Sequence, residues 1–272
     1  MRYDKDLQFL AECRNEDLKT LADYLTHDAK GEIRMAEQLT DTDAYLCNYP
    51  DNMRNMWREV ANELQRYGGN TIVNCCRRYG VPYWEIVRDV CKKMRVDYSE
   101  HEAIEAVEER LLRKMFADAV GRMDTKELAA ALEIPAKDLQ KQCTLAAVQL
   151  LIRKGGEVFA SKIALYTANM VSRMMLGHGL WFAGRNTLGK VASVFSGPFG
   201  WVLTAGWTAY DLSSPAYRVT IPCVIQIAYM RSVYNQSSDL LWKRKTSYIR
   251  KRRKRSRRLK GFPDWRKRLL VS

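Results

Sequence analysis

Apolar residues in this chain recur at three- and four-residue steps, and this spacing sets its fold class. The stretch SEHEAIEAVEERLLRKMFADAV, residues 99–120, is the clearest example. Its apolar stripe comprises Ile104, Val107, Leu111, Met115 and Ala119. Ser99 and Glu102 form a capping-box pattern, and Glu109 with Arg113 is an i,i+4 pair of favourable orientation. No sustained period-two alternation indicates strands. The sequence therefore predicts an all-α, multi-helix globular bundle.

Other helices are predicted where a capping residue precedes, and glycine follows, an apolar-periodic run. Their expected ranges are from Asn15 or Asp17 to about His27, from Asp51 through Trp57 to Tyr67, the stretch YWEIVRDVCKKM at 83–94, a helix from Pro135, and one from about Glu157 to Leu176. We expect Gly68-Gly69 to close the second of these helices and Gly155-Gly156 to stop the helix from Pro135. The organisation along the chain predicts four parts: 1–98, 99–176, 177–235 and 236–272.

The excess of positive over negative charge is confined to one end of the chain. The sequence carries 45 Lys and Arg, 31 Asp and Glu, and a net charge of +14. Residues 240–272 hold 15 of the bases and one acid, Asp264, so the rest has 45 − 15 = 30 bases and 31 − 1 = 30 acids. The body is neutral, and residues 236–272 form a polybasic C-terminal arm. Its cations are Lys243, Arg244, Lys245, Arg250, Lys251, Arg252, Arg253, Lys254, Arg255, Arg257, Arg258, Lys260, Arg266, Lys267 and Arg268.

A Gly-rich apolar region precedes the arm. Residues 191–210 carry no charge over 20 positions, which is about the length of a membrane-spanning helix, but Gly197-Pro198 interrupts them. The following segment, AYRVTIPCVIQIAYMRS, has twelve apolar-rich residues between Arg218 and Arg231, too few to cross a bilayer. Together they predict a helical hairpin, either the buried centre of the domain or an element on or in a membrane. The membrane-contact candidates are Trp201, Trp207, Tyr210, Phe262 and Trp265.

Catalytic and metal-binding patterns are weak. The seven cysteines are odd in number and lack CxxC spacing, which is typical of reduced thiols and disfavours a metal. Among three histidines, His178 between two glycines is the most distinctive, yet no nucleophile or carboxylate stands at a diagnostic spacing. Residues 124–142 resemble a helix-turn-helix, with Glu133 where a turn glycine is usual. We expect neither an enzyme nor a cofactor.

Several stretches resemble the bacterial YaaW family. They are DKDLQFLAECRNEDLKTLADYLTHDAKGEIR at 4–34, ELQRYGGNTIVNCCRRYG at 63–80, LGHGLWFAG at 176–184 and SPAYRVTIPCVIQIAYMR at 214–231. The resemblance covers most of residues 3–235. It implies a functionally uncharacterised protein with an N-terminal domain of unknown function and a region related to ubiquinol–cytochrome c chaperones. Such a relation implies a helical assembly factor near a membrane, and it assigns no residue a role.

The arm determines the expected partners. Basic side chains are attracted to anionic lipid, and the ending GFPDWRKRLLVS mixes aromatics with cations as interfacial segments do. The expected function is therefore a non-enzymatic, chaperone-like accessory factor bound to an anionic membrane surface or a membrane-protein client. The alternative is sequence-nonspecific binding of RNA or DNA through the same cations. The start of the sequence lacks the apolar region of a signal peptide, so we expect a cytoplasmic protein, peripheral at the inner membrane.

Overall fold

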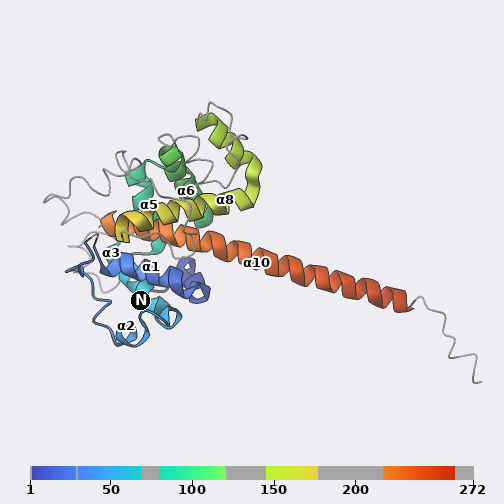
Figure 1. Cartoon of the computed structure of the whole chain (residues 1–272), viewed down its shortest axis with the longest axis horizontal. Coiled ribbons are helices and arrows are strands. Elements are labelled where there is room, and N and C mark those ends of the chain that lie inside the picture. Colours follow the sequence, from blue (N-terminus) through green and yellow to red (C-terminus); the bar gives the residue numbers. More distant parts are fainter. Residues whose placement is uncertain (1, 29, 69–79, 121–144, 177–216, 261–272) are drawn as a thin grey trace, which may run out of the picture. The chain divides into compact units, whose positions relative to one another are not determined.

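The computed structural model describes residues 2–28, 30–68, 80–120, 145–176 and 217–260 (Figure 1). The chain divides into two compact units, Met1–Ser232 and Val233–Ser272. Every regular element in the described ranges is a helix, and the backbone bridge between His27 and Ile33 is their one strand-like pairing. The predicted all-α fold class is confirmed. The division into four parts stays a prediction.

The first unit begins with short helices. They are the 3-10 helix η1 (Lys5–Glu12), α1 (Asn15–Thr26), α2 (Asp43–Asn48), the 3-10 helix η2 (Met53–Met56) and α3 (Trp57–Tyr67). The buried carboxylate of Asp4 joins this region to α5 (Tyr83–Met94). Its Oδ1 accepts the N–H of Asp6 at 3.0 Å, and its Oδ2 accepts the N–H of Tyr83 at 2.6 Å. One side chain therefore caps the starts of two helices that are far apart in sequence.

Three helices packed in series follow α3. α5 packs on α6 (Ile104–Val120), and α6 packs more extensively on α8 (Leu145–Leu176). Phe116 of α6 and Tyr166 of α8 meet edge to face, with ring centroids 5.6 Å apart. Such pairs contribute about 0.5–1.5 kcal/mol beyond the area they bury. The α6–α8 contact is thus specified by aromatic geometry as well as by apolar burial.

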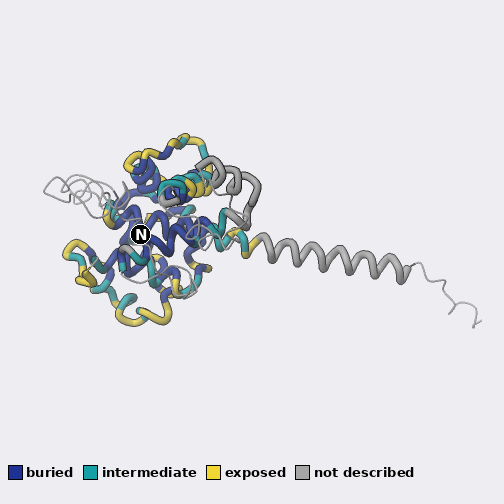
Figure 2. Tube along the Cα trace, turned by 45° about the horizontal axis from the view of Figure 1, so that its top comes forward, coloured by how far each residue is buried: buried dark blue, intermediate teal, exposed yellow. Residues whose placement is uncertain are grey.

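The first part of α10 (Tyr217–Lys260) lies in the core of the first unit. Its buried apolar residues are Val219, Ile221, Cys223, Val224, Ile225, Ile227, Ala228, Tyr229 and Met230. A helix that is apolar on every side is buried on every side, and the dark blue segments at the centre of this unit in Figure 2 show the result. The apolar dozen therefore forms part of the buried centre of the domain, whereas the other half of the predicted hairpin, residues 191–210, lies outside the described residues. None of the helices in the described ranges has the length and apolar character that crossing a bilayer needs.

Several helix boundaries agree with the sequence predictions. α1 starts at Asn15 and has His27 as its C-cap, and α5 covers the predicted stretch 83–94. α3 ends at Tyr67, where the N–H of Gly68 donates to the carbonyl of Leu64 at 3.1 Å. Glycine is required at position 68 because a Cβ there would run into the side chains of Val81 and Ile86. The glycine after α3 was correctly interpreted as a stop signal.

The predicted start of α6 is wrong by four residues, because a cap at Ser99 predicts a helix from position 100. Ser99 does donate its N–H to Glu102 Oε2 at 3.3 Å, as a capping box requires, but the helix begins at Ile104. The reason is that the bond closes a separate turn, in which the N–H of Glu102 donates to the carbonyl of Ser99 at 3.2 Å. Glu102 is held there by Arg110 from within α6. Ser99 and Glu102 therefore precede α6 and stabilise it through the contact between Glu102 and Arg110.

The prediction that Gly155-Gly156 ends a helix is also wrong. α8 runs without interruption from Leu145 to Leu176, and Figure 1 shows that its first part follows a different direction from the rest. A glycine in a helix costs about 1 kcal/mol relative to alanine, which packing along a 32-residue helix can offset. The pair therefore lies within a helix instead of closing one.

Candidate functional site

The basic arm is helical over most of its length. In the second unit α10 continues to Lys260, so residues 233–260 form a rod of about 42 Å at 1.5 Å per residue. Twelve of the fifteen cations predicted to bind anions occupy positions on it: Lys243, Arg244, Lys245, Arg250, Lys251, Arg252, Arg253, Lys254, Arg255, Arg257, Arg258 and Lys260. The remaining three, Arg266, Lys267 and Arg268, lie outside the described residues.

The helical register separates the arm's positions into two halves. At 100° per residue, eight of the twelve cationic positions fall on one half, here called the cationic half. They are Lys243, Arg244, Arg250, Lys251, Lys254, Arg255, Arg257 and Arg258. Five of the six apolar positions between 240 and 260 fall on the other, the apolar half: Leu241, Trp242, Tyr248, Ile249 and Leu259. The cations Lys245, Arg252, Arg253 and Lys260 share the apolar half. This arrangement is that of a basic amphipathic helix with extra charge on its apolar side.

Other predicted positions lie outside the described residues. They are the membrane-contact candidates Trp201, Trp207, Tyr210, Phe262 and Trp265, the distinctive His178, and the helix-turn-helix-like stretch 124–142. The other two histidines are described: His101 is exposed and His27 caps α1. Within the described ranges no group of three His, Cys, Asp or Glu side chains is placed to hold a metal ion.

The first unit contains a buried ionic cluster where α10 meets α6. Arg231 Nε donates to Glu108 Oε2 at 2.7 Å, and the two side chains are 7% and 3% exposed. Arg231 Nη2 also donates to the carbonyl of Asp6 at 2.7 Å, and its guanidinium lies 4.3 Å from the ring centroid of Phe9. Tyr83 supplies a further donor, from its hydroxyl to Glu108 Oε1 at 2.7 Å. Three helices and η1 are tied together at this point.

Protonation states in this cluster follow from burial and pairing. Burial lowers the pKa of Arg231, but Glu108 together with the neighbouring Tyr83 and Glu105 outweighs burial, so the pKa of Arg231 is raised. Burial also raises the pKa of Tyr83 well above its ordinary value, so its phenol remains a donor. The guanidinium of Arg231, the carbonyl of Asp6 and the hydroxyl of Tyr83 all form hydrogen bonds within the cluster. The cluster therefore has a structural role in joining helices.

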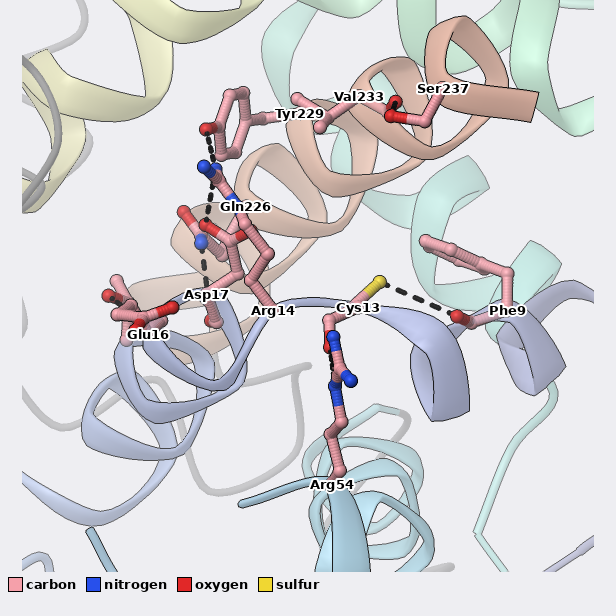
Figure 3. Close-up of polar contacts among 11 residues, drawn as sticks. Phe9, Cys13, Arg14, Glu16, Asp17, Arg54, Gln226, Tyr229, Val233 and Ser237 are labelled. Atoms are coloured by element: carbon pink, nitrogen blue, oxygen red, sulfur yellow. Dashed lines mark hydrogen bonds and ion pairs between the residues drawn. The ribbon is translucent and has the colours of Figure 1, made fainter. Parts of the chain in front are cut away.

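A second polar cluster joins α1 to α10 (Figure 3). Arg14 donates from Nε to Asp17 Oδ2 at 2.9 Å and from Nη2 to the hydroxyl of Tyr229 at 2.7 Å. One turn earlier in α10, Gln226 Nε2 donates to the backbone carbonyl of Asp17 at 3.3 Å. Gln226 is fully buried, and Asp17 is 2% exposed. These bonds join buried polar groups of α10 to the start of α1, which favours one rotation of α10 against α1.

These clusters give the family motifs a physical explanation. The partners Arg14 and Asp17 belong to the motif at 4–34, and Gln226, Tyr229 and Arg231 to the motif at 214–231. Two of the four stretches that carry the resemblance therefore pack on each other, and their polar residues contribute to that packing.

Glu108 is the member of the ionic cluster that sequence reasoning missed. A signal was present: position 108 is four residues after Ile104 and three before Leu111, so this acid falls within the apolar stripe of α6. An acid within such a stripe indicates a buried partner. Arg231 was interpreted as the edge of an apolar segment, and its 6% exposure shows that it belongs to the core.

Comparison with known proteins places these features in a family. The family model "Domain of unknown function (DUF3944)" matches residues 1–35, the region that contains η1 and α1. A protein of Helicobacter pylori strain J99 named "UPF0174 protein" is 35% identical over 241 residues, which is 88% of this chain and 95% of the relative. "UPF0174 protein YaaW" of Escherichia coli strain K12 is 30% identical over 234 residues, 84% of this chain and 94% of the relative. No solved structure matches.

Proposed function

This chain belongs to the UPF0174 family, whose names state no activity, and from that premise we propose that it is a non-enzymatic accessory or assembly factor recruited to anionic membrane surfaces by its basic arm. The observation that carries the proposal is the helical register of residues 240–260. It separates most cationic positions from most apolar ones along a single helix. A helix of this kind lies in the interface plane, with its apolar half toward the acyl chains and its cations toward the headgroups.

The charge distribution along the chain supports recruitment by the arm. The body has equal numbers of acids and bases, so its net charge does not attract it to an anionic surface. Each Lys or Arg near an anionic leaflet contributes about 1 kcal/mol, and this falls off within a Debye length. Binding that depends on the arm must therefore weaken with added salt.

The four cations on the apolar half are compatible with this orientation. Long basic side chains bury their methylene stems and extend their charges to the headgroup level. Lys245, Arg252, Arg253 and Lys260 are expected to contribute less than cations on the cationic half, because they must reach around the helix. The two halves thus make separable contributions.

Two full-length variants with matched charge test the proposal. The first exchanges four residues of the cationic half for glutamine: Arg250, Lys251, Lys254 and Arg258. The second exchanges the four on the apolar half: Lys245, Arg252, Arg253 and Lys260. Both lower the net charge equally. In cosedimentation at low salt with vesicles of phosphatidylglycerol and phosphatidylcholine, we expect the first variant to lose roughly a hundred- to a thousand-fold in partitioning, and the second at most about ten-fold.

Two outcomes would contradict recruitment by an amphipathic arm. Equal losses of vesicle binding in the two variants would show that it does not matter on which half of the helix the cations lie. Equal binding of the unaltered protein to pure phosphatidylcholine vesicles would show that the charge is irrelevant.

A nucleic-acid role is the second candidate, and a specific observation favours it. Cationic positions also occur on the apolar half, so neither half of the arm helix is free of positive charge. A polyanion that encloses a helix, such as the groove of a duplex, uses charge on several sides. Nuclease-sensitive copurification that falls steeply with salt, together with equal losses of RNA binding in the two variants, would support this reading.

A further inference from the structure

A cavity of about 310 Å³ lies at the C-terminal end of α1, and none of its lining residues belongs to either polar cluster. It is bounded by the end of α1, the turn that follows it, Tyr49 and the last residues of α8. Its volume is at the lower end of the range for small-molecule sites. The hydrogen bonds of its walls determine which kind of ligand it suits.

Both carboxylate oxygens of Asp23 already accept hydrogen bonds from other side chains of the chain. Its Oδ2 accepts from Lys19 Nζ at 2.7 Å, and its Oδ1 accepts from the hydroxyl of Tyr49 at 3.1 Å. The ammonium of Lys19 lies 5.0 Å from the ring centroid of Tyr49. The charges of Asp23 and Lys19 therefore compensate each other, and the proton of Tyr49 is used within the wall.

The tautomer of His27 follows from its neighbour. Thr26 Oγ1 donates its single proton to the carbonyl of Ala22 at 2.9 Å. The contact of 2.7 Å between Thr26 Oγ1 and His27 Nδ1 then requires the hydrogen to sit on Nδ1. In the neutral ring Nε2 is consequently an acceptor. Within the described ranges no side chain or backbone group donates to it.

Asp28 supplies a second acceptor. Its Oδ1 accepts the backbone N–H groups of Lys30 at 2.8 Å and Glu32 at 3.0 Å. These N–H groups of Glu32 and Lys30 lower the pKa of Asp28, so it is a carboxylate. Its Oδ2 receives no hydrogen bond from the part of the chain that the structure describes. The turn is completed by Gly31, which has a φ of 82° and lines the cavity without a side chain.

The lining also has an apolar part. Met175 and Leu176, at the end of α8, line the cavity together with the turn. The cavity thus combines a carboxylate and an imidazole acceptor with a short aliphatic surface. Lys30 is exposed. Among the lining residues, its ammonium is the one group that competes with a cationic ligand for the Asp28 carboxylate.

We infer that this cavity binds a small molecule with a primary ammonium group on a short alkyl chain. The ammonium carries three donors and no acceptor, which complements Asp28 Oδ2 and His27 Nε2. The alkyl chain lies against Met175 and Leu176. An anion of the same size is disfavoured because it would face the Asp28 carboxylate, while Asp23 compensates the charge of Lys19 and the one cation among the lining residues, Lys30, is exposed.

Histidine-selective NMR of the full chain tests the inference, because the protein has three histidines. The probes are pentylammonium chloride, 1-pentanol and sodium pentanoate, which share a five-carbon chain and differ in charge. We expect the His27 resonance to move saturably with pentylammonium and to respond little to the other two. The resonance is assigned with His27→Gln or, if that variant fails to fold, by elimination with His101→Gln and His178→Gln.

Asp28→Asn is the decisive variant and Asp51→Asn its matched control. Asparagine keeps Oδ1 for the turn but replaces the acceptor Oδ2 with a donor, so we expect pentylammonium to bind about ten-fold more weakly, or worse. Asp51 is exposed and outside the cavity lining, and its variant should bind as the unaltered chain does. Equal weakening in both variants, an equal response to 1-pentanol, or no saturable shift would overturn the inference.

Discussion

Arg231 and Glu108 are 123 positions apart in sequence and form a buried ion pair, with 2.7 Å between Nε and Oε2. The pair connects the end of the core segment of α10 to the middle of α6. Each of its members depends on the other, because either charge alone would be buried without compensation.

Breaking this pair from one side is expected to be strongly destabilising. Arg231→Met leaves the Glu108 carboxylate buried and without its cation, which costs about 3–5 kcal/mol in the free energy of unfolding. The double variant Arg231→Met/Glu108→Leu removes both charges and should recover most of that loss. Urea denaturation of both single variants and the double variant measures the coupling.

The exposed pair of Glu109 and Arg113 is the control. Their Oε1 and Nη2 atoms lie 2.5 Å apart, but the side chains are 46% and 43% exposed. Arg113→Ala should cost at most about 0.5 kcal/mol. A double variant no more stable than Arg231→Met alone would show that packing, and not charge compensation, dominates at the buried pair.

Local signals in the sequence predicted elements well and predicted contacts poorly. Gly68 marked the end of α3 because a glycine after an apolar-periodic run is a local stop signal, although the side chains that exclude a Cβ there, Val81 and Ile86, lie further along the chain. The prediction that Gly155-Gly156 ends a helix is wrong because the stability of α8 comes in part from packing on α6. A local sequence pattern contains no information on that packing. Charge segregation predicted a basic arm at the end of the chain, and its division from the rest stays a prediction. The pairing of Arg231 with Glu108 depends on tertiary structure, and the sequence showed only an acid within an apolar stripe.

Gly80 is expected to tolerate no side chain. A Cβ at this position would overlap the backbone carbonyl of Gln65, which accepts the N–H of Val81 at 3.0 Å and is fixed within α3. Gly80→Ala should therefore lower the free energy of unfolding by about 1–3 kcal/mol or more, measured by urea denaturation. Gly31→Ala is a useful comparison, because there a Cβ meets open space and the cost is the backbone strain at φ 82°, roughly 1–2 kcal/mol. A Gly80→Ala protein as stable as the original chain would contradict this packing.

Acid should weaken the brace between Glu102 and Arg110. The hydrogen bond from Arg110, with help from the N–H of Ser99, lowers the pKa of Glu102 in the folded chain. A carboxyl whose folded pKa is below its unfolded value stabilises the protein above the unfolded pKa, and this contribution is lost as the pH falls through the folded pKa. The stability difference between the unaltered chain and Glu102→Gln should thus be constant above about pH 5.5 and shrink below about pH 4.5. Chemical denaturation at a series of pH values measures it, and a difference that persists unchanged to about pH 3 would contradict the assignment.

The described cysteines should differ sharply in reactivity toward iodoacetamide. Cys47 is exposed, whereas Cys13, Cys91 and Cys223 are buried. Burial raises the pKa of Cys13 and of Cys91 to about 12, so near pH 8 the reactive thiolate is scarce in both. The Sγ of Cys13 is further occupied by donation to the carbonyl of Phe9 at 3.5 Å. We expect Cys47 to be alkylated at least about a hundred-fold faster, as followed by timed quenching and peptide mass spectrometry. Comparable alkylation rates for Cys13 and Cys47 in the folded protein would contradict this prediction, because η1 would then open far more readily than its buried side chains and its capping by Asp4 imply. In urea the two rates should be comparable, which is the control.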